Sequence, residues 1–262
     1  MSSRVLMRPL SQLLTPAMCP PPNLSKSLKS ILGTKLVLDL DGDVVTLGSG
    51  DRVAAWPDLS AFANTVSQGT LAKQPTHVLA ALDGHAALQF TASDAAHLFT
   101  NTFSGIPAAT PFQVFTIATM ADLLDNRTFS NFGSSIGISS HTGPRLYYSV
   151  AGALRAGHSM PALYAQHVAW VASSSYRLVD YEYSTTIVLR VQNAPQDNPN
   201  PATVNVLDAQ TQLTVGLFND RVTAPHNGRI ARMFAACPLP TAAELVEVLA
   251  LIRRTYPSLA LP

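Results

Sequence analysis

The sequence is poor in charged residues and in cysteine. Charged side chains make up 13% of the 262 residues, about half of the roughly 25% that is usual for soluble proteins. Seventeen basic and sixteen acidic residues leave a formal net charge of +1, which excludes a strong electrostatic attraction to nucleic acid or to an anionic membrane. The two cysteines, Cys19 and Cys237, cannot form a disulfide framework of the kind that holds small secreted domains together.

Long hydrophobic runs are also absent. No stretch approaches the 18 apolar residues that a membrane-spanning helix needs. The chain starts with Arg4 and Arg8, like the basic start of a secretory signal, but Arg8, Pro9 and Ser11 interrupt the apolar run that must follow. We therefore expect neither a membrane span nor export by this segment.

From Lys35 onward, short β-prone runs alternate with glycine, proline, asparagine and aspartate. This texture is typical of an antiparallel sandwich, and such a sandwich commonly occupies about 200–250 residues as one domain. The sequence therefore predicts an all-β fold, a two-sheet antiparallel jelly-roll sandwich. The candidate strands are Lys35–Leu40, Val53–Trp56, Ala86–Phe90, Phe112–Met120, Arg145–Val150, His167–Ala172, Arg177–Tyr183, Thr186–Val191, Thr203–Leu207, Gln212–Phe218 and Gly228–Ala235.

The end of the chain predicts one helix over residues 241–254. Thr241 and Glu244 have the spacing of a capping box, in which each side chain satisfies a backbone amide of the first turn. The positions that follow at helical spacing are apolar, and the last turn is basic, where positive charge is favoured. These residues are Leu245, Val248, Leu249 and Ile252, followed by Arg253 and Arg254.

The first 34 residues predict an extended N-terminal arm rather than part of the sandwich. They lack sustained periodicity and contain Pro9, Pro16, Pro20, Pro21 and Pro22. We therefore divide the chain into an arm over residues 1–34 and a sandwich over residues 35–262 that includes the terminal helix. The arm residues expected to anchor the protein to a neighbour are Arg4, Leu6, Arg8 and Leu10.

Two blocks of sequence carry a family resemblance. The first runs through Trp56-Pro57-Asp58-Leu59-Ser60, Gln74-Pro75-Thr76, Asp83-Gly84 and Leu88-Gln89-Phe90; the second runs from a Val-Gly strand at residue 215 through Asn227-Gly228 to the capped helix and Arg254-Thr255-Tyr256. Together they resemble the concanavalin A-like, or laminin-G-like, jelly rolls that occur in bacteriophage particle proteins and in secreted carbohydrate-binding modules. This order of motifs is fairly specific for the fold and poorly specific for activity.

The resemblance implies a non-enzymatic structural protein of a bacteriophage particle, as a head decoration, collar or tail-fibre component. Its partners would be other virion proteins of the capsid or tail, and its location would be the virion, assembled in the host cytoplasm. Independently of the resemblance, the low charge and the high apolar content favour a homo-oligomer or permanent partners. The alternative is a carbohydrate-binding module that recognises a bacterial surface polysaccharide. For that function Tyr176, Tyr181 and Tyr183 are the candidate glycan contacts, because sugar sites pair an aromatic plane with hydrogen-bonding groups.

Asp180 and Glu182 are the best candidates for hydrolytic chemistry. Residues at i and i+2 of a strand project from the same face, and two carboxylates there can serve as nucleophile and acid. Glucanases of this fold carry a third acidic residue, but Ser184 and Thr186 occupy the corresponding positions here. A solvated pair of acidic side chains is the favoured interpretation, and we expect no catalytic residues.

Asp39, Asp41 and Asp43 suggest calcium, which prefers several carboxylate oxygens from one tight loop. The rest of an EF-hand spacing is missing, so an edge strand that runs into a turn at Gly42 is favoured. Zinc has little support, because the seven histidines show neither His-x-His nor His-x-x-x-His spacing. We therefore expect no metal or cofactor, with calcium at the three aspartates as the open alternative.

Overall fold

The computed structural model describes residues 24–122, 127–133, 144–148, 153–157, 164–167, 173–184, 186–192, 194–195, 209–217, 224–259 and 261. The expected anchoring residues Arg4, Leu6, Arg8 and Leu10 and the expected strand 203–207 lie outside these ranges. Among the described residues, no helix is both long enough and apolar enough to cross a membrane.

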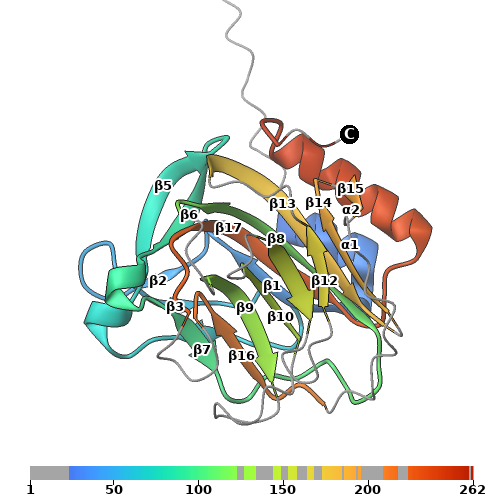
Figure 1. Cartoon of the computed structure of the whole chain (residues 1–262), viewed down its shortest axis with the longest axis horizontal. Coiled ribbons are helices and arrows are strands. Elements are labelled where there is room, and N and C mark those ends of the chain that lie inside the picture. Colours follow the sequence, from blue (N-terminus) through green and yellow to red (C-terminus); the bar gives the residue numbers. More distant parts are fainter. Residues whose placement is uncertain are drawn as a thin grey trace, which may run out of the picture.

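Two antiparallel sheets form the body of the protein (Figure 1). Sheet A has eight strands, in the order β15 (Ala194–Pro195), β14 (Ile187–Val191), β13 (Ser173–Tyr183), β8 (Phe112–Met120), β17 (Gly228–Ala236), β6 (His85–Phe90) and β5 (Thr76–Leu82), with β1 (Leu36–Asp41) also paired to β17. Sheet B has nine strands, in the order β12 (Tyr164–His167), β11 (Leu154–Gly157), β10 (Arg145–Tyr148), β9 (Arg127–Gly133), β16 (Gln212–Val215), β7 (Leu98–Thr100), β4 (Val66–Ser67), β3 (Val53–Trp56) and β2 (Thr46–Leu47). The predicted all-β, two-sheet antiparallel sandwich is confirmed.

The helices form a third layer on the far side of sheet A from sheet B. Helix α1 (Leu24–Leu32) and helix α2 (Ala242–Thr255) pack against each other, and Figure 1 shows them together beside sheet A. Because sheet A is covered on both faces, the side chains of β8 alternate between two cores. Val114 lies between the sheets, whereas Phe115 and Ile117 lie under the helices. All nine residues of β8 are buried, as expected for a strand covered on both faces.

Strand β17 has two partners along one edge. Its residues 228–230 pair with β6, and residues 232–236 pair with β1. Gly42 follows β1 where the two partners meet, and its backbone N–H donates to the carbonyl of Ala231 at 2.9 Å. A Cβ atom on Gly42 would lie 2.3 Å from the carbonyl oxygen of Ala86, so only glycine fits at this junction.

Helix α1 corrects the prediction of an extended arm through residue 34. Leu28 and Leu32 are buried in the core under the helices, and Ile31 packs against the same cluster. The spacing of these three residues is helical, and the prolines that suggested an arm all precede residue 23. The arm prediction is therefore wrong for residues 24–32, where burial of an apolar stripe favours a helix.

Helix α2 confirms the predicted terminal helix. The Thr241 hydroxyl accepts from the Glu244 amide at 3.2 Å, and the Glu244 carboxylate accepts from the Thr241 amide at 2.6 Å, which completes the capping box. Val248 and Ile252 are buried against sheet A.

The Trp56–Ser60 motif has a structural role. The Asp58 carboxylate accepts hydrogen bonds from the backbone amides of Asp39, Ser60 and Asn64 at 2.7–2.9 Å, and from the Ser60 hydroxyl at 2.7 Å. The Trp56 indole N–H donates to the carbonyl of Asp41 at 2.7 Å. The motif therefore holds the loop after β3 against β1.

Candidate functional site

The three tyrosines predicted to contact glycan are buried. Tyr181 and Tyr183 point from β13 into the core between the sheets, and Tyr176 points into the core under the helices. Burial raises the pKa of the Tyr181 and Tyr183 hydroxyls. Because none of the three rings offers an open face, the prediction that they stack on a sugar is wrong.

Asp180 and Glu182 lie on the other face of β13, where they belong to an ion-pair network. Arg190 of β14 donates to Asp180 at 2.8 Å and to Glu182 at 3.3 Å, and the Gln113 amide donates to Asp180 at 2.7 Å. Asp180 is 2% exposed, and burial raises its pKa although Arg190 acts in the opposite direction. These contacts connect three neighbouring strands and support a structural role for the two carboxylates rather than a catalytic one.

The three aspartates of the expected calcium loop are held by cationic side chains and a backbone amide. The guanidinium of Arg232, fully buried, donates to the carboxylates of Asp39 and Asp41. Burial lowers the pKa of Arg232, but the two carboxylates more than offset it, so the pKa lies above its usual value. An arginine therefore supplies the positive charge between Asp39 and Asp41.

The third carboxylate, that of Asp43, forms a hydrogen bond with His85. The His85 Nδ1 lies 2.5 Å from an Asp43 oxygen, and the backbone N–H of Ala86 donates to the other oxygen at 2.6 Å. The hydrogen bond to Asp43 raises the pKa of His85 above 6.5, against the effect of burial. In the part of the chain that the structure describes, no group of three or more histidine, cysteine, aspartate or glutamate residues has the geometry to hold a metal ion.

The outer face of sheet B carries a different set of side chains. On β10, Leu146 and Tyr148 point into the core between the sheets, so Arg145 and Tyr147 point outward. The same alternation directs Thr214 of β16 outward, because its neighbours Leu213 and Val215 are in the core.

Strand register places the outward residues in one line across the sheet. Arg145 pairs with Asn131, Asn131 pairs with Thr214, Thr214 pairs with Phe99, and Phe99 pairs with Ser67. Neighbouring strands are about 4.8 Å apart, so this line extends over roughly 19 Å. We call these five residues, from Arg145 to Ser67, the outer row.

Arg145 of the outer row contacts Tyr147, which lies two residues further along the same strand. The guanidinium carbon of Arg145 lies 3.8 Å from the centre of the Tyr147 ring, a cation–π contact that holds the guanidinium over the sheet. Burial, and the nearby positive charge of Arg155 on β11, lower the pKa of Arg145. Arg155 pairs with Tyr147 across the strands, so their side chains project from the same face of the sheet.

Sequence reasoning missed this site because its residues come from separate strands. Arg145, Asn131, Thr214 and Phe99 belong to four strands, and each is an ordinary residue in its local sequence. The sequence does show which residues of one strand share a face, because side chains alternate along Arg145-Leu146-Tyr147-Tyr148. It does not show which residues of other strands lie beside them, since that depends on how the strands pair.

Solved structures of other proteins share this fold. A sialidase of Trypanosoma rangeli in complex with sialic acid is 10% identical, with a TM-score of 0.53, over 88% of this chain and 37% of its own. An arabinofuranosidase complexed with arabinofuranosyl-α-1,2-xylobiose is 9% identical, with a TM-score of 0.58, over 78% of this chain and 51% of its own. This chain therefore spans between a third and a half of those proteins. No protein-family model matches it, and no curated protein matches its sequence.

These similarities correct one expectation. The solved structures described above are glycoside hydrolases, so the expectation of a protein without enzymatic activity is wrong as an inference from fold resemblance. At about one tenth identity the likeness establishes the fold and assigns no reaction. The expected virion role and the concanavalin A-like family stay predictions.

Proposed function

We propose that this domain binds saccharides on the outer face of sheet B. The observation that carries the proposal is the outer row with its neighbours, which brings guanidinium, amide, hydroxyl and aromatic groups to one sheet face. Sugar-binding sites combine an aromatic surface with a few fixed polar groups. The outer face of sheet A has no such surface to offer near α1 and α2, because the helices cover it.

Exposure indicates which side chains a ligand would meet. Arg145, Arg155 and Phe99 keep part of their surface accessible, whereas Tyr147, Asn131 and Thr214 are nearly buried. The accessible groups would therefore make the direct contacts, and Tyr147 would hold the Arg145 guanidinium in position. A guanidinium presents a planar fork of donors, which suits adjacent hydroxyls or a carboxylate on a sugar ring.

Binding to a panel of bacterial surface polysaccharides, measured by glycan array and then by calorimetry, tests the proposal. We expect Arg145→Met to weaken binding about tenfold or more, since a hydrogen bond to a charged group contributes about 1.5–3 kcal/mol. Phe99→Ala should also weaken binding, because it removes an aromatic surface against which a sugar ring can pack. Arg177→Ala is the matched control, because Arg177 lies on β13 of the other sheet. No binding across the panel, or equal losses in the control, would refute the proposal.

The mixtures of protein and polysaccharide also test whether the protein hydrolyses the saccharide. Release of reducing sugar would indicate that a bound saccharide is cleaved. Glu182→Gln then tests whether the Asp180–Glu182 pair contributes, since that variant removes a carboxylate from the pair.

A further inference from the structure

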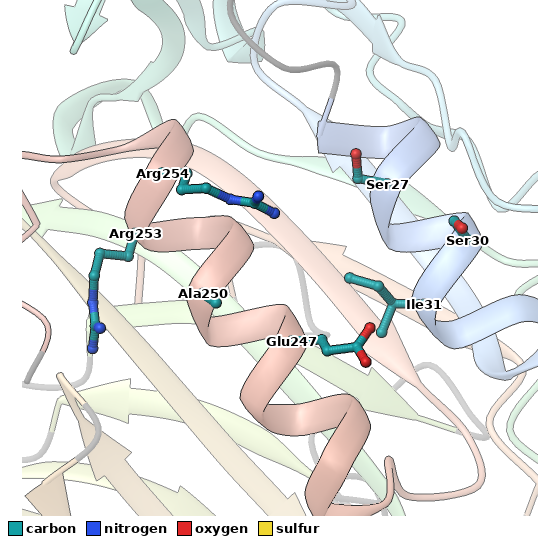
Figure 2. A pocket seen from close by; sticks show the side chains of 7 residues that line it. All are labelled: Ser27, Ser30, Ile31, Glu247, Ala250, Arg253 and Arg254. Carbon is teal, nitrogen blue, oxygen red and sulfur yellow. The ribbon is translucent and has the colours of Figure 1, made fainter.

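A groove runs between the two helices on the outside of the protein. It has a volume of about 530 Å³ and is lined by Ser27, Ser30 and Ile31 of α1 and by Glu247, Ala250, Arg253 and Arg254 of α2. Figure 2 shows Glu247 and Arg254 extending from α2 toward α1 on either side of Ala250, while Arg253 extends from the opposite side of α2.

The surface of α2 beside this groove is exposed and partly apolar. Val246 is 66% exposed, and Ala243 and Ala250 are exposed on the same side of the helix. The buried side of α2 already packs on sheet A through Val248 and Ile252. The helix therefore has a second, outward apolar face that nothing within the described chain covers.

The charges along this outward face have a particular arrangement. Glu247 and Arg254 are seven residues apart, about 10 Å along the helix, with Ala250 between them. Within the described residues, neither side chain forms an ion pair or a side-chain hydrogen bond. The face carries an acidic side chain at one end and a basic side chain at the other. Its charges are therefore complementary to those of a second copy of the same face that runs in the opposite direction.

We propose that this face is a two-fold interface at which α2 packs antiparallel against α2 of a second copy of the chain. A two-fold axis beside Ala250 reverses the order of residues, so Glu247 meets Arg254 of the second copy, and Arg254 meets its Glu247. The small side chain of Ala250 lies at the axis, where two helices approach most closely.

The other exposed residues fit the same arrangement. On the far flank of α2, the reversal brings the aliphatic stem of Arg253 over Val246 of the second copy, where a long side chain can cover apolar surface. On the flank of α2 that faces α1, the two-fold axis places both copies of α1 on the same side of the interface. The groove between α1 and α2 of each copy then faces the other copy. The interface is thus a packing of four helices.

This interface is independent of the proposed saccharide site. The helices and the outer row lie on opposite sides of the sandwich, since α1 and α2 cover sheet A. A dimer formed through α2 would not cover either outer row and would bind a repeating polysaccharide at two points, which increases the overall affinity.

Sedimentation equilibrium of the full chain tests the interface. We expect the unmodified protein to form a dimer. We expect Glu247→Arg and Arg254→Glu to weaken dimerisation about tenfold or more, because each places like charges opposite one another twice. The double variant Glu247→Arg/Arg254→Glu exchanges the charges and should restore the dimer.

Asp51→Arg is the control for Glu247→Arg, since it makes the same change in net charge at an exposed loop position away from the helices. Far-ultraviolet circular dichroism verifies that each variant is folded. A protein that stays monomeric up to about 100 µM would overturn the proposal. So would a double variant no more dimeric than the single ones, or a control that dissociates as they do.

Discussion

The guanidinium of Arg232 lies against the carboxylate of Asp39, and both side chains are fully buried. The two residues are 193 positions apart and belong to β17 and β1, which pair within sheet A. Asp41 accepts from the same guanidinium. The contact therefore joins the beginning and the end of the sandwich by charge as well as by backbone pairing.

Removing Arg232 should be costly. We expect Arg232→Met to lower the free energy of unfolding by about 3–5 kcal/mol, because it leaves buried carboxylates without a counter-charge. Arg232→Lys keeps the charge but loses the forked geometry, and its effect should be smaller. Urea denaturation at neutral pH measures both. A methionine variant as stable as the original protein would show that the buried pair is energetically neutral.

Asp58 should be a structural residue, although it belongs to the motif that carries the family resemblance. Asp58→Ala removes the acceptor for three backbone amides, and we expect a loss of about 3 kcal/mol, since buried donors without a partner are expensive. Asp58→Asn retains one acceptor oxygen and should lose less. Thermal unfolding distinguishes the two, and saccharide binding by the folded asparagine variant should be unchanged.

His85 should make the protein less stable as the pH rises above 6.5. Its pKa in the folded protein lies above 6.5 because of the hydrogen bond to Asp43. The charged pair therefore contributes fully below pH 6.5, and this contribution is lost as the pH passes through the raised pKa. Since Asp43 is partly exposed, we expect the change to be below about 1 kcal/mol. Urea denaturation between pH 6 and pH 9, in parallel with His85→Gln, measures it; an identical slope in both proteins would contradict the assignment.

His226 should have the opposite effect, at acidic pH. It is buried between Phe90 and Phe129, with ring centres 5.9 Å and 4.5 Å away, and burial lowers its pKa to about 3. The unfolded chain takes up a proton near pH 6.5 whereas the folded chain resists it. Unfolding is therefore favoured between pH 6.5 and pH 3, by up to about 1.4 kcal/mol per pH unit.

The variant His226→Phe should remove this part of the acid sensitivity. It replaces the imidazole with an apolar ring between two others, so the folded chain no longer has a buried group that opposes protonation. Denaturation curves at pH 7, 5 and 4 test this expectation. If the two proteins lose stability in parallel, another group is responsible for the acid response.

Some elements were readable from local sequence because their determinants are local. Helix α2 has its capping residues and apolar stripe within fifteen positions, and strands Val53–Trp56 and Phe112–Met120 have the predicted bounds. Strand β9 was missed for an equally local reason. Phe129 and Phe132 both enter the core although they are three positions apart, because the register shifts between β9 and β10. A bulge of this kind breaks the period of two on which strand prediction relies.

By itself, the sequence determined the class of fold, the terminal helix and the two faces of each well-alternating strand, because these follow from the order of apolar and polar residues along the chain. Only the tertiary structure decided which face of β13 points into the core between the sheets. Tyr181 is buried on that face, and Asp180 on the other face accepts a hydrogen bond from Arg190. The tertiary structure likewise decided that Asp39 meets Arg232 and that Arg145 stands beside Asn131. The physical reason is that pairing between strands joins residues distant in sequence, and the free energy of burial depends on what each face finally packs against.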